Sequence, residues 1–449
     1  MTTPIADFVK KYAQSTTSRF HMPGHKGKAF LGCEALDITE INGADVLYSA
    51  SGIISESEEN ATAIFKSGHS FYSTEGSSLA IKAMLALIKK KTPYGQPTRV
   101  LAARNVHKAF IYACALLDIE AEWIYPKEFT HLCSCQISAQ QLDTMLKSSD
   151  YLPNAVYITS PDYLGNIADI KGLSEVCHQY GIPLLVDNAH GAYLAFLEHS
   201  MHPLALGADM CCDSAHKTLP VLTGGAYLHI SKDHQKNSIE DIRSALSLFA
   251  STSPSYLTLQ SLDLCNDYIE NGYKARLSET IKKIHLLKSS LSELGFPAPC
   301  DSFSEELKIV FSKSTCGYSG AELKEHLSKF GIEIEFADCD HTVLMVSPEN
   351  SDSDLKRVYE AFCLLEKRAS ADTAKIPTLK PPLMAISIRE AIFSDSEIID
   401  VKNACGRICA SPTVSCPPAI PIVVSGEAID RSAIELLNYY GIEKIEVIK

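Results

Sequence analysis

The segment from Asp213 to Ala226 holds the residues with the clearest chemical potential in the chain. Its one lysine, Lys217, is flanked by Ser214 and His216 and followed by a Gly-Gly pair. An apolar, strand-like run lies on either side, so we expect a loop between two buried strands. Desolvation there disfavours the ammonium form, and a neutral lysine attacks carbonyl groups to form a Schiff base. Taken in isolation, such a lysine is more often an ordinary loop residue.

Other segments supply partners for this lysine. Asp187 ends an apolar run and could hold a proton on a ring nitrogen. Ser73-Thr-Glu-Gly76 precedes a helix predicted over 79–91, whose first N–H groups could bind a phosphate. His107 or His190 could stack on a ring. Together these groups suit pyridoxal 5'-phosphate. The plainer alternatives are a turn aspartate, an ordinary helix cap and core or surface histidines.

Strand-like apolar runs alternate with amphipathic helices from about residue 60 to 260. This alternation predicts an α/β fold with a largely parallel sheet that is covered by helices on both faces. Ligands of such sheets bind beyond the carboxyl ends of the strands. Residues at such ends are His107, Asp162, Asp187, His190 and Lys217. We therefore expect them around one crevice.

With 449 residues the chain is too long for a single core. We predict an N-terminal arm with entrance loops (1–60), a cofactor-binding large domain (61–260), a small α+β domain (261–368), a linker (369–384) and a C-terminal domain (385–449). The long segment 261–294 is predicted to be helical. The small domain is predicted from strands at 307–311, 332–336 and 342–346 and helices at 320–330 and 354–367.

The composition narrows the class of protein. The formal net charge of -13 argues against a nucleic-acid partner and permits a cationic substrate. We find no apolar signal segment and no apolar run long enough to span a membrane, so we expect a cytoplasmic protein. The fifteen cysteines are then expected to be free thiols. Cys133-Ser-Cys135 and the pair Cys211-Cys212 lack zinc-binding spacing, so we predict no metal site.

These motifs resemble those of the Orn/Lys/Arg decarboxylases, pyridoxal-phosphate enzymes of the aspartate aminotransferase fold (fold type I). The resemblance is to the short bacterial form without an N-terminal wing domain. The most specific motif is Ser214-Ala-His-Lys-Thr-Leu-Pro220 with Leu222-Thr-Gly-Gly225. The other motifs are His21–Gly27, Thr39–Leu47, Ser73–Gly76, Arg104–Lys108, Val186–Gly191, Ser251–Tyr256, Arg389–Ala391, Gly406–Arg407 and Pro417–Pro421.

The resemblance implies a function and a set of site residues. The chain is expected to decarboxylate a basic amino acid (arginine, lysine or ornithine) to a polyamine-pathway amine, as a homodimer or higher homo-oligomer. The implied catalytic residues are Lys217, His216, His107 and Asp187. The implied cofactor contacts are Ser73, Thr74, Gly76, His107, Asp187, Ala189, His190, Ser214, His216, Lys217 and, from the neighbouring subunit, Thr252. Asp45 could meet the distal cation of the substrate.

The chain departs from the family pattern at a few positions. Asn188 stands where glutamate is usual, Asp162 where threonine is usual and Ala419 where glycine is usual. Asn188 and Asp162 are expected near the substrate, so the sequence does not say which basic amino acid is used. Transamination or β-elimination stays open as an alternative reaction, and so does a protein that only binds.

Overall fold

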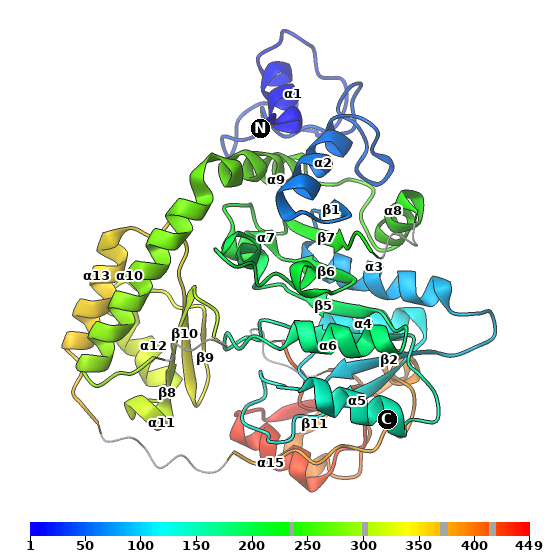
Figure 1. Ribbon diagram of the computed structural model, residues 1–449, viewed down its shortest axis with the longest axis vertical. Coiled ribbons are helices and arrows are strands. Elements are labelled where there is room, and N and C mark those ends of the chain that lie inside the picture. Colours follow the sequence, from blue (N-terminus) through cyan, green and yellow to red (C-terminus); the bar gives the residue numbers. More distant parts are fainter. Residues whose placement is uncertain (234–237, 299–303, 369–375, 413–418) are drawn as a thin grey trace. The chain divides into compact units, whose positions relative to one another are not determined.

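The computed structural model describes residues 1–233, 238–298, 304–368, 376–412 and 419–449 (Figure 1). The chain divides into two compact units. Unit 1 comprises Met1–Val100, Ala139–Ser160 and Asp169–Ala275, and unit 2 comprises Leu101–Ser138, Pro161–Ala168 and Arg276–Lys449. Within the described residues, no helix is both long and apolar enough to cross a membrane.

The central sheet has seven strands in the order β1-β7-β6-β5-β4-β2-β3. The strands are β1 (His69–Ser73), β2 (Thr98–Ala103), β3 (Ile119–Ile124), β4 (Ala155–Thr159), β5 (Leu184–Asp187), β6 (Met210–Asp213) and β7 (Ala226–Ile230). Strands β4, β5 and β6 are parallel, whereas β7 is antiparallel to both β6 and β1. Strand β7 reverses because its connection from β6 holds only the short helix α7 (Ala215–Thr218), too little for a crossover. The predicted mostly parallel α/β sheet is confirmed.

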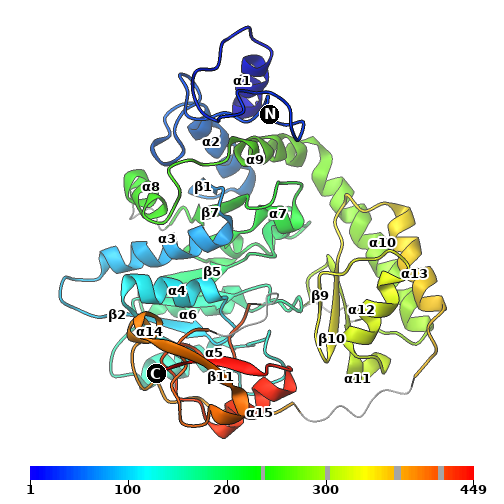
Figure 2. The same cartoon turned by 180° about the vertical axis from the view of Figure 1, so that it is seen from behind.

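Helices of unit 1 lie on both faces of the central sheet, most of whose strands also belong to unit 1. They are α1 (Pro4–Ala13), α2 (Ile53–Phe65), α3 (Gly76–Lys91), α5 (Ala139–Ser148), α6 (Ile170–Gln179), α8 (Ile239–Ser247) and α9 (Tyr256–Tyr268). Figures 1 and 2 show α6 over one face of the sheet and α3 over the other. Every residue of α3 from Leu79 to Ile88 except Lys82 is buried, which fixes the start of this helix against the strands.

The long helical segment predicted over 261–294 is interrupted. Helix α9 ends at Tyr268 and α10 spans Lys274–Glu293, and the turn between them has non-helical backbone angles at Asn271 and Gly272. Gly272 has a φ of 90°, a conformation that favours glycine. The Asn-Gly pair therefore kinks the segment, and the predicted helical structure is confirmed on both sides of the kink.

Unit 2 contains a three-stranded antiparallel sheet of order β8-β10-β9. Its strands are β8 (Lys308–Ser312), β9 (Phe336–Ala337) and β10 (His341–Met345), with helices α4 (Lys108–Leu117), α11 (Lys313–Cys316), α12 (Gly320–Ser328) and α13 (Asp352–Cys363) in the same unit. The strand predicted over 332–336 was correct only at its last residue. The alternation of Ile and Glu there is typical of a strand, but only Phe336 and Ala337 lie opposite β10.

The C-terminal part of unit 2 has a small core of its own. Strands β11 (Ser396–Asp400) and β12 (Lys444–Ile448) pair antiparallel, next in sequence to α14 (Ile388–Phe393) and α15 (Arg431–Tyr439). Ala419 has a φ of 57°, which explains why the resembled family prefers glycine there. Residues 369–375 of the predicted linker, and Pro417 and Pro418 of the proline motif, lie outside the described residues. The domain boundaries proposed from the sequence stay predictions.

Candidate active site

Lys217 and His190 meet beyond the carboxyl ends of two inner strands of the central sheet. Lys217 lies on α7, directly after β6, and its Nζ is 3.1 Å from Nε2 of His190, which follows β5. The two strands are parallel neighbours, so their carboxyl ends bring these side chains together. His190 is buried and Lys217 is half-buried. The predicted proximity of these two residues is present in the structure.

Asp187 ends β5 and is only 2% exposed. One carboxylate oxygen accepts the N–H of Ala189 at 3.2 Å, and the other accepts the hydroxyl of Tyr157 at 3.2 Å. The Cys212 thiol lies 3.5 Å from the first oxygen. The carboxylate is therefore held from two neighbouring strands, beyond what a simple turn aspartate needs. Tyr157 was not predicted, because in sequence it is one more apolar-run residue of β4.

The turn before α3 does not place a side-chain cap on the helix. Ser73 Oγ donates to the carbonyl of Gly76 at 3.0 Å and accepts the N–H of Glu75 at 3.2 Å. Glu75, at the N-cap of α3, makes no side-chain cap hydrogen bond. Because the first turn of a helix has N–H groups without helical partners, this end suits a phosphate. The alternative of an ordinary side-chain-capped helix does not fit.

The lysine loop packs directly onto this turn. Ser214 Oγ donates to Ser77 Oγ at 2.8 Å, and the N–H of Gly76 donates to the carbonyl of Gly224 at 2.7 Å. A Cβ at Gly224 would lie 2.8 Å from the carbonyl oxygen of Thr74. Gly224 also has a φ of 92°, so only glycine fits this contact without strain. The Gly-Gly pair thus lets the two loops approach.

His216 is half-buried beside Lys217 and donates from Nδ1 to the carbonyl of Gly225 at 2.9 Å. Burial is the main cause that lowers the pKa of His216, and the charge of Lys217 lowers it further. A neutral ring with its hydrogen on Nδ1 leaves Nε2 able to accept a proton.

A buried network lies behind the lysine loop. Asp213 accepts from the Asn188 amide at 2.7 Å and lies 3.0 Å from His202 Nε2 and 3.3 Å from His229 Nε2. Burial by itself would raise the pKa of Asp213, but the two histidines outweigh it and hold that pKa well below its usual range. Asn188 is fully buried in this network, and its expected place near the substrate stays a prediction. Neither histidine was predicted, because no local pattern links them to Asp213.

The loop that contains Thr252 is exposed. Ser251, Thr252 and Ser253 are all accessible, and the N–H of Ser251 donates to Glu75 Oε1 at 2.6 Å. The loop is thereby tied to the turn before α3 of its own chain. The predicted contact of Thr252 with the cofactor of a neighbouring subunit stays a prediction.

His107 and Asp162 belong to unit 2. His107 is the N-cap of α4, where its Nδ1 accepts the N–H of Ala109 at 3.1 Å. Asp162 is buried, and its oxygens accept the N–H groups of Leu164 and Asn166, both at 2.9 Å, and the Asn166 amide at 2.8 Å. Burial raises the pKa of Asp162. Both oxygens thus serve its own loop, and stacking of His107 on a cofactor stays a prediction.

These features define the class of fold: the chain has the fold of the fold type I pyridoxal-phosphate enzymes. The lysine decarboxylase of Francisella novicida matches it with a TM-score of 0.82 at 16% identity, covering 99% of this chain and 81% of that one. The serine palmitoyltransferase of Sphingomonas wittichii matches with a TM-score of 0.56 at 15% identity, covering 80% of this chain and 82% of that one. At these identities the likeness shows the fold.

The family follows from the sequence comparisons. The model of the Orn/Lys/Arg decarboxylase major domain matches residues 3–304, and that of the C-terminal domain matches residues 377–444. The chain belongs to the Orn/Lys/Arg decarboxylase family. It is 29% identical to the arginine decarboxylase of Bacillus subtilis, over 97% of this chain and 93% of that protein. It is also 29% identical to the arginine decarboxylase of Bacillus cereus, over 94% of this chain and 96% of that protein.

Proposed function

We propose that this enzyme removes the carboxylate of a basic amino acid (arginine, lysine or ornithine) and releases carbon dioxide and the corresponding amine of the polyamine pathway. The observation that carries the proposal is the 3.1 Å contact of Lys217 with His190 beside Asp187, in a chain of the Orn/Lys/Arg decarboxylase family. The net charge of -13 is compatible with a cationic substrate. The curated relatives at 29% identity are named arginine decarboxylases, which makes arginine the first substrate to test.

The residues of unit 1 fit pyridoxal phosphate. The N-terminus of α3, which has no side-chain cap, would hold the phosphate, Asp187 would face the ring nitrogen, and Lys217 would bind the aldehyde carbon. When bound, the cofactor supplies a conjugated ring that accepts the electron pair left by the departing carboxylate. Asp187 keeps the ring nitrogen protonated, and Tyr157 and the Ala189 N–H hold that carboxylate in place.

Proton transfer is the second task of the site. Lys217 would hold the cofactor through its amine, and when that amine is free, either Lys217 or His216 would return a proton to Cα. His190 Nε2 orients the lysine amine by the contact at 3.1 Å. The lowered pKa of His216 leaves it neutral near pH 7, so it can accept a proton in one step and donate it in another.

The distal cation of the substrate has a less obvious partner. Asp45 was expected to meet it, but its carboxylate accepts the N–H groups of Val46, Ser51, Gly52 and Ile54 at 2.8–3.1 Å. Asp45 has a φ of 67° and organises its own loop in this way. These hydrogen bonds fix the Asp45 carboxylate, and its contact with the distal cation of the substrate stays a prediction.

A substrate panel tests the proposed reaction. The holoenzyme is incubated with arginine, lysine and ornithine, and carbon dioxide and product mass are measured. Equal amounts of carbon dioxide and amine support decarboxylation, whereas a keto acid would establish transamination and released ammonia would establish elimination. A protein that only binds would show no visible absorption from a lysine-linked cofactor.

We also propose that the enzyme works in the cytoplasm as a homodimer or larger homo-oligomer. The exposed loop around Thr252 supports this, because a loop that completes a neighbour's site must be accessible in the single chain. Sedimentation of the holoenzyme measures the oligomeric state.

A further inference from the structure

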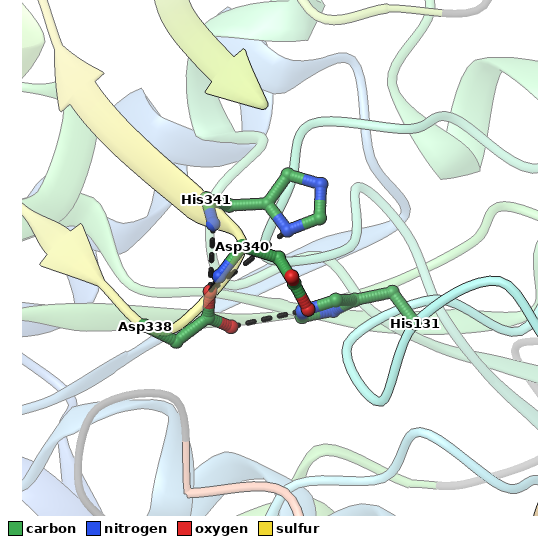
Figure 3. Close-up of side chains that lie close together, drawn as sticks. All are labelled: His131, Asp338, Asp340 and His341. Atoms are coloured by element: carbon green, nitrogen blue, oxygen red, sulfur yellow. Dashed lines mark hydrogen bonds and ion pairs between the residues drawn. The ribbon is translucent and has the colours of Figure 1, made fainter. Parts of the chain in front are cut away.

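Unit 2 holds a second cluster of side chains that the decarboxylation does not use. Asp338 and Asp340 lie in the turn between β9 and β10, His341 begins β10, and His131 lies in the loop that follows β3. One ligand atom from each of the four lies within 4.8 Å of the others. Figure 3 shows the imidazoles and carboxylates turned toward one another. The residues come from segments about two hundred positions apart, so sequence spacing predicts no site here.

His341 contributes a buried nitrogen. Its Nδ1 has no hydrogen-bond partner within the described part of the chain, and the nearest carboxylate oxygen, Asp338 Oδ1, is 3.9 Å away. A buried polar atom without a partner calls for an explanation, and a bound ion is one.

The two carboxylates are held in place by other groups. Asp338 Oδ1 accepts the N–H groups of Asp340 and His341 at 2.8 and 2.7 Å. Tyr439 donates its hydroxyl to Asp340, 2.8 and 2.7 Å from the two oxygens. Ligating carboxylates in proteins are oriented by such outer hydrogen bonds.

His131 acts on Asp338 and not on an ion directly. Its Nδ1 accepts the N–H of Cys133 at 3.0 Å, so the ring hydrogen is on Nε2, which donates to Asp338 Oδ2 at 2.9 Å. This arrangement orients the carboxylate and leaves its other oxygen toward His341. A cavity of about 220 Å³ borders both imidazoles and offers room for a water molecule. Lys308 also lines it and is paired with Glu305 at 2.8 Å.

We propose that Asp338, Asp340 and His341 bind one divalent transition-metal ion of the zinc type, with water from the cavity as a further ligand and His131 as a positioning residue. The two carboxylates balance the charge of the ion, and one imidazole with two carboxylates is a donor set that zinc accepts. The ion would tie the β9–β10 turn to the segment that contains Tyr439. None of its residues is among those assigned to decarboxylation, so it does not depend on that proposal.

Zinc uptake by the holoenzyme tests the site. The protein is stripped with a chelator and titrated with zinc chloride, with binding followed by calorimetry and metal content by mass spectrometry. One equivalent should bind, and His341→Ala and Asp340→Asn should each weaken it at least about 100-fold. His131→Gln should weaken it about 10–100-fold, as expected for an outer residue. His285→Ala, which changes an exposed histidine paired with Glu306, should bind like the unaltered chain.

The ligand types are read independently by X-ray absorption at the zinc edge. Only nitrogen and oxygen at about 2.0–2.2 Å should appear, since zinc–sulfur distances are about 2.3 Å. A sulfur shell would assign the ion to cysteines and overturn the proposal. So would failure of the stripped protein to bind zinc stoichiometrically, or unchanged binding by His341→Ala. Asp340→Asn keeps an acceptor for Tyr439, so it serves if His341→Ala does not fold.

Discussion

The side-chain amide of Asn188 donates to the buried carboxylate of Asp213 at 2.7 Å. Asn188 directly follows Asp187, and Asp213 directly precedes the loop that carries Lys217. One hydrogen bond therefore joins the turn after the ring-nitrogen partner to the strand that leads into the lysine. It also gives a physical reason for asparagine at a position where the resembled family usually has glutamate.

The first prediction concerns this pair. Asn188→Asp replaces the donor by a second carboxylate against Asp213, and we expect a loss of about 3 kcal/mol in the free energy of unfolding. The pKa of the new carboxyl would be raised by Asp213, so the loss grows as the pH rises from about 4 and shrinks below it. Urea unfolding at several pH values measures this. The control is Asn403→Asp, which changes an exposed residue. An equally small change in the free energy of unfolding for both variants would contradict a stabilising role of the Asn188–Asp213 hydrogen bond.

Lys217→Ala should abolish turnover and the visible absorption of the lysine-linked cofactor, because we expect no other lysine to take its place. Some cofactor can still bind through its phosphate, so cofactor content by itself does not decide the question. Steady-state assays and absorption spectra are compared with those of Lys171→Ala, which changes an exposed lysine of α6. Retained activity in Lys217→Ala would show that the assignment is wrong.

Asp187→Asn should leave the cofactor bound and lower kcat by orders of magnitude, since an amide does not keep the ring nitrogen protonated. Tyr157→Phe removes only one hydrogen bond to the same carboxylate. That single loss is worth about 1.5–3 kcal/mol at most, so its effect on kcat should be much smaller. Near-normal kcat in a correctly folded Asp187→Asn enzyme would rule out the proposed role.

Gly224→Ala should weaken the binding of pyridoxal phosphate at least about tenfold, because the new Cβ would press on the Thr74 carbonyl. The matched control is Gly181→Ala. That glycine also has a positive φ, of 69°, but a Cβ there meets open space. Both variants should lose about 1–2 kcal/mol of stability through backbone strain, and only Gly224→Ala should lose cofactor affinity. Equal affinities of the two variants for pyridoxal phosphate would show that the loop containing Gly224 does not contribute to phosphate binding.

The last prediction concerns sharing of the site between subunits. Lys217→Ala chains are mixed with Thr252→Asp chains, in which a negative charge opposes the phosphate, under conditions that exchange subunits. If Thr252 serves the partner, one site of each heterodimer contains both intact residues and activity partly returns. Absence of recovery in proven heterodimers, or full activity of a stable monomer, would show that the loop serves its own chain or none.

The residue types and their local order are enough to predict the chemistry and the class of fold. Lys217 after a buried run, Asp187 at a strand end and the small residues before α3 are short-range signals, and alternating strands and helices determine a mostly parallel sheet. Such signals depend on hydrophobic periodicity and on turn chemistry, which act within a few residues.

The tertiary structure decided which distant residues share an environment. Strand β7 pairs beside β6, which places His229 of β7 next to Asp213, and His202 from the segment before β6 reaches the same carboxylate. The turn at Asp338 and the loop at His131 meet in the same way, although no periodic pattern relates them. Contacts between residues that are two hundred positions apart arise from the packing of whole helices and strands. Local sequence therefore leaves open whether a polar residue such as Asn188 faces a ligand or a buried carboxylate.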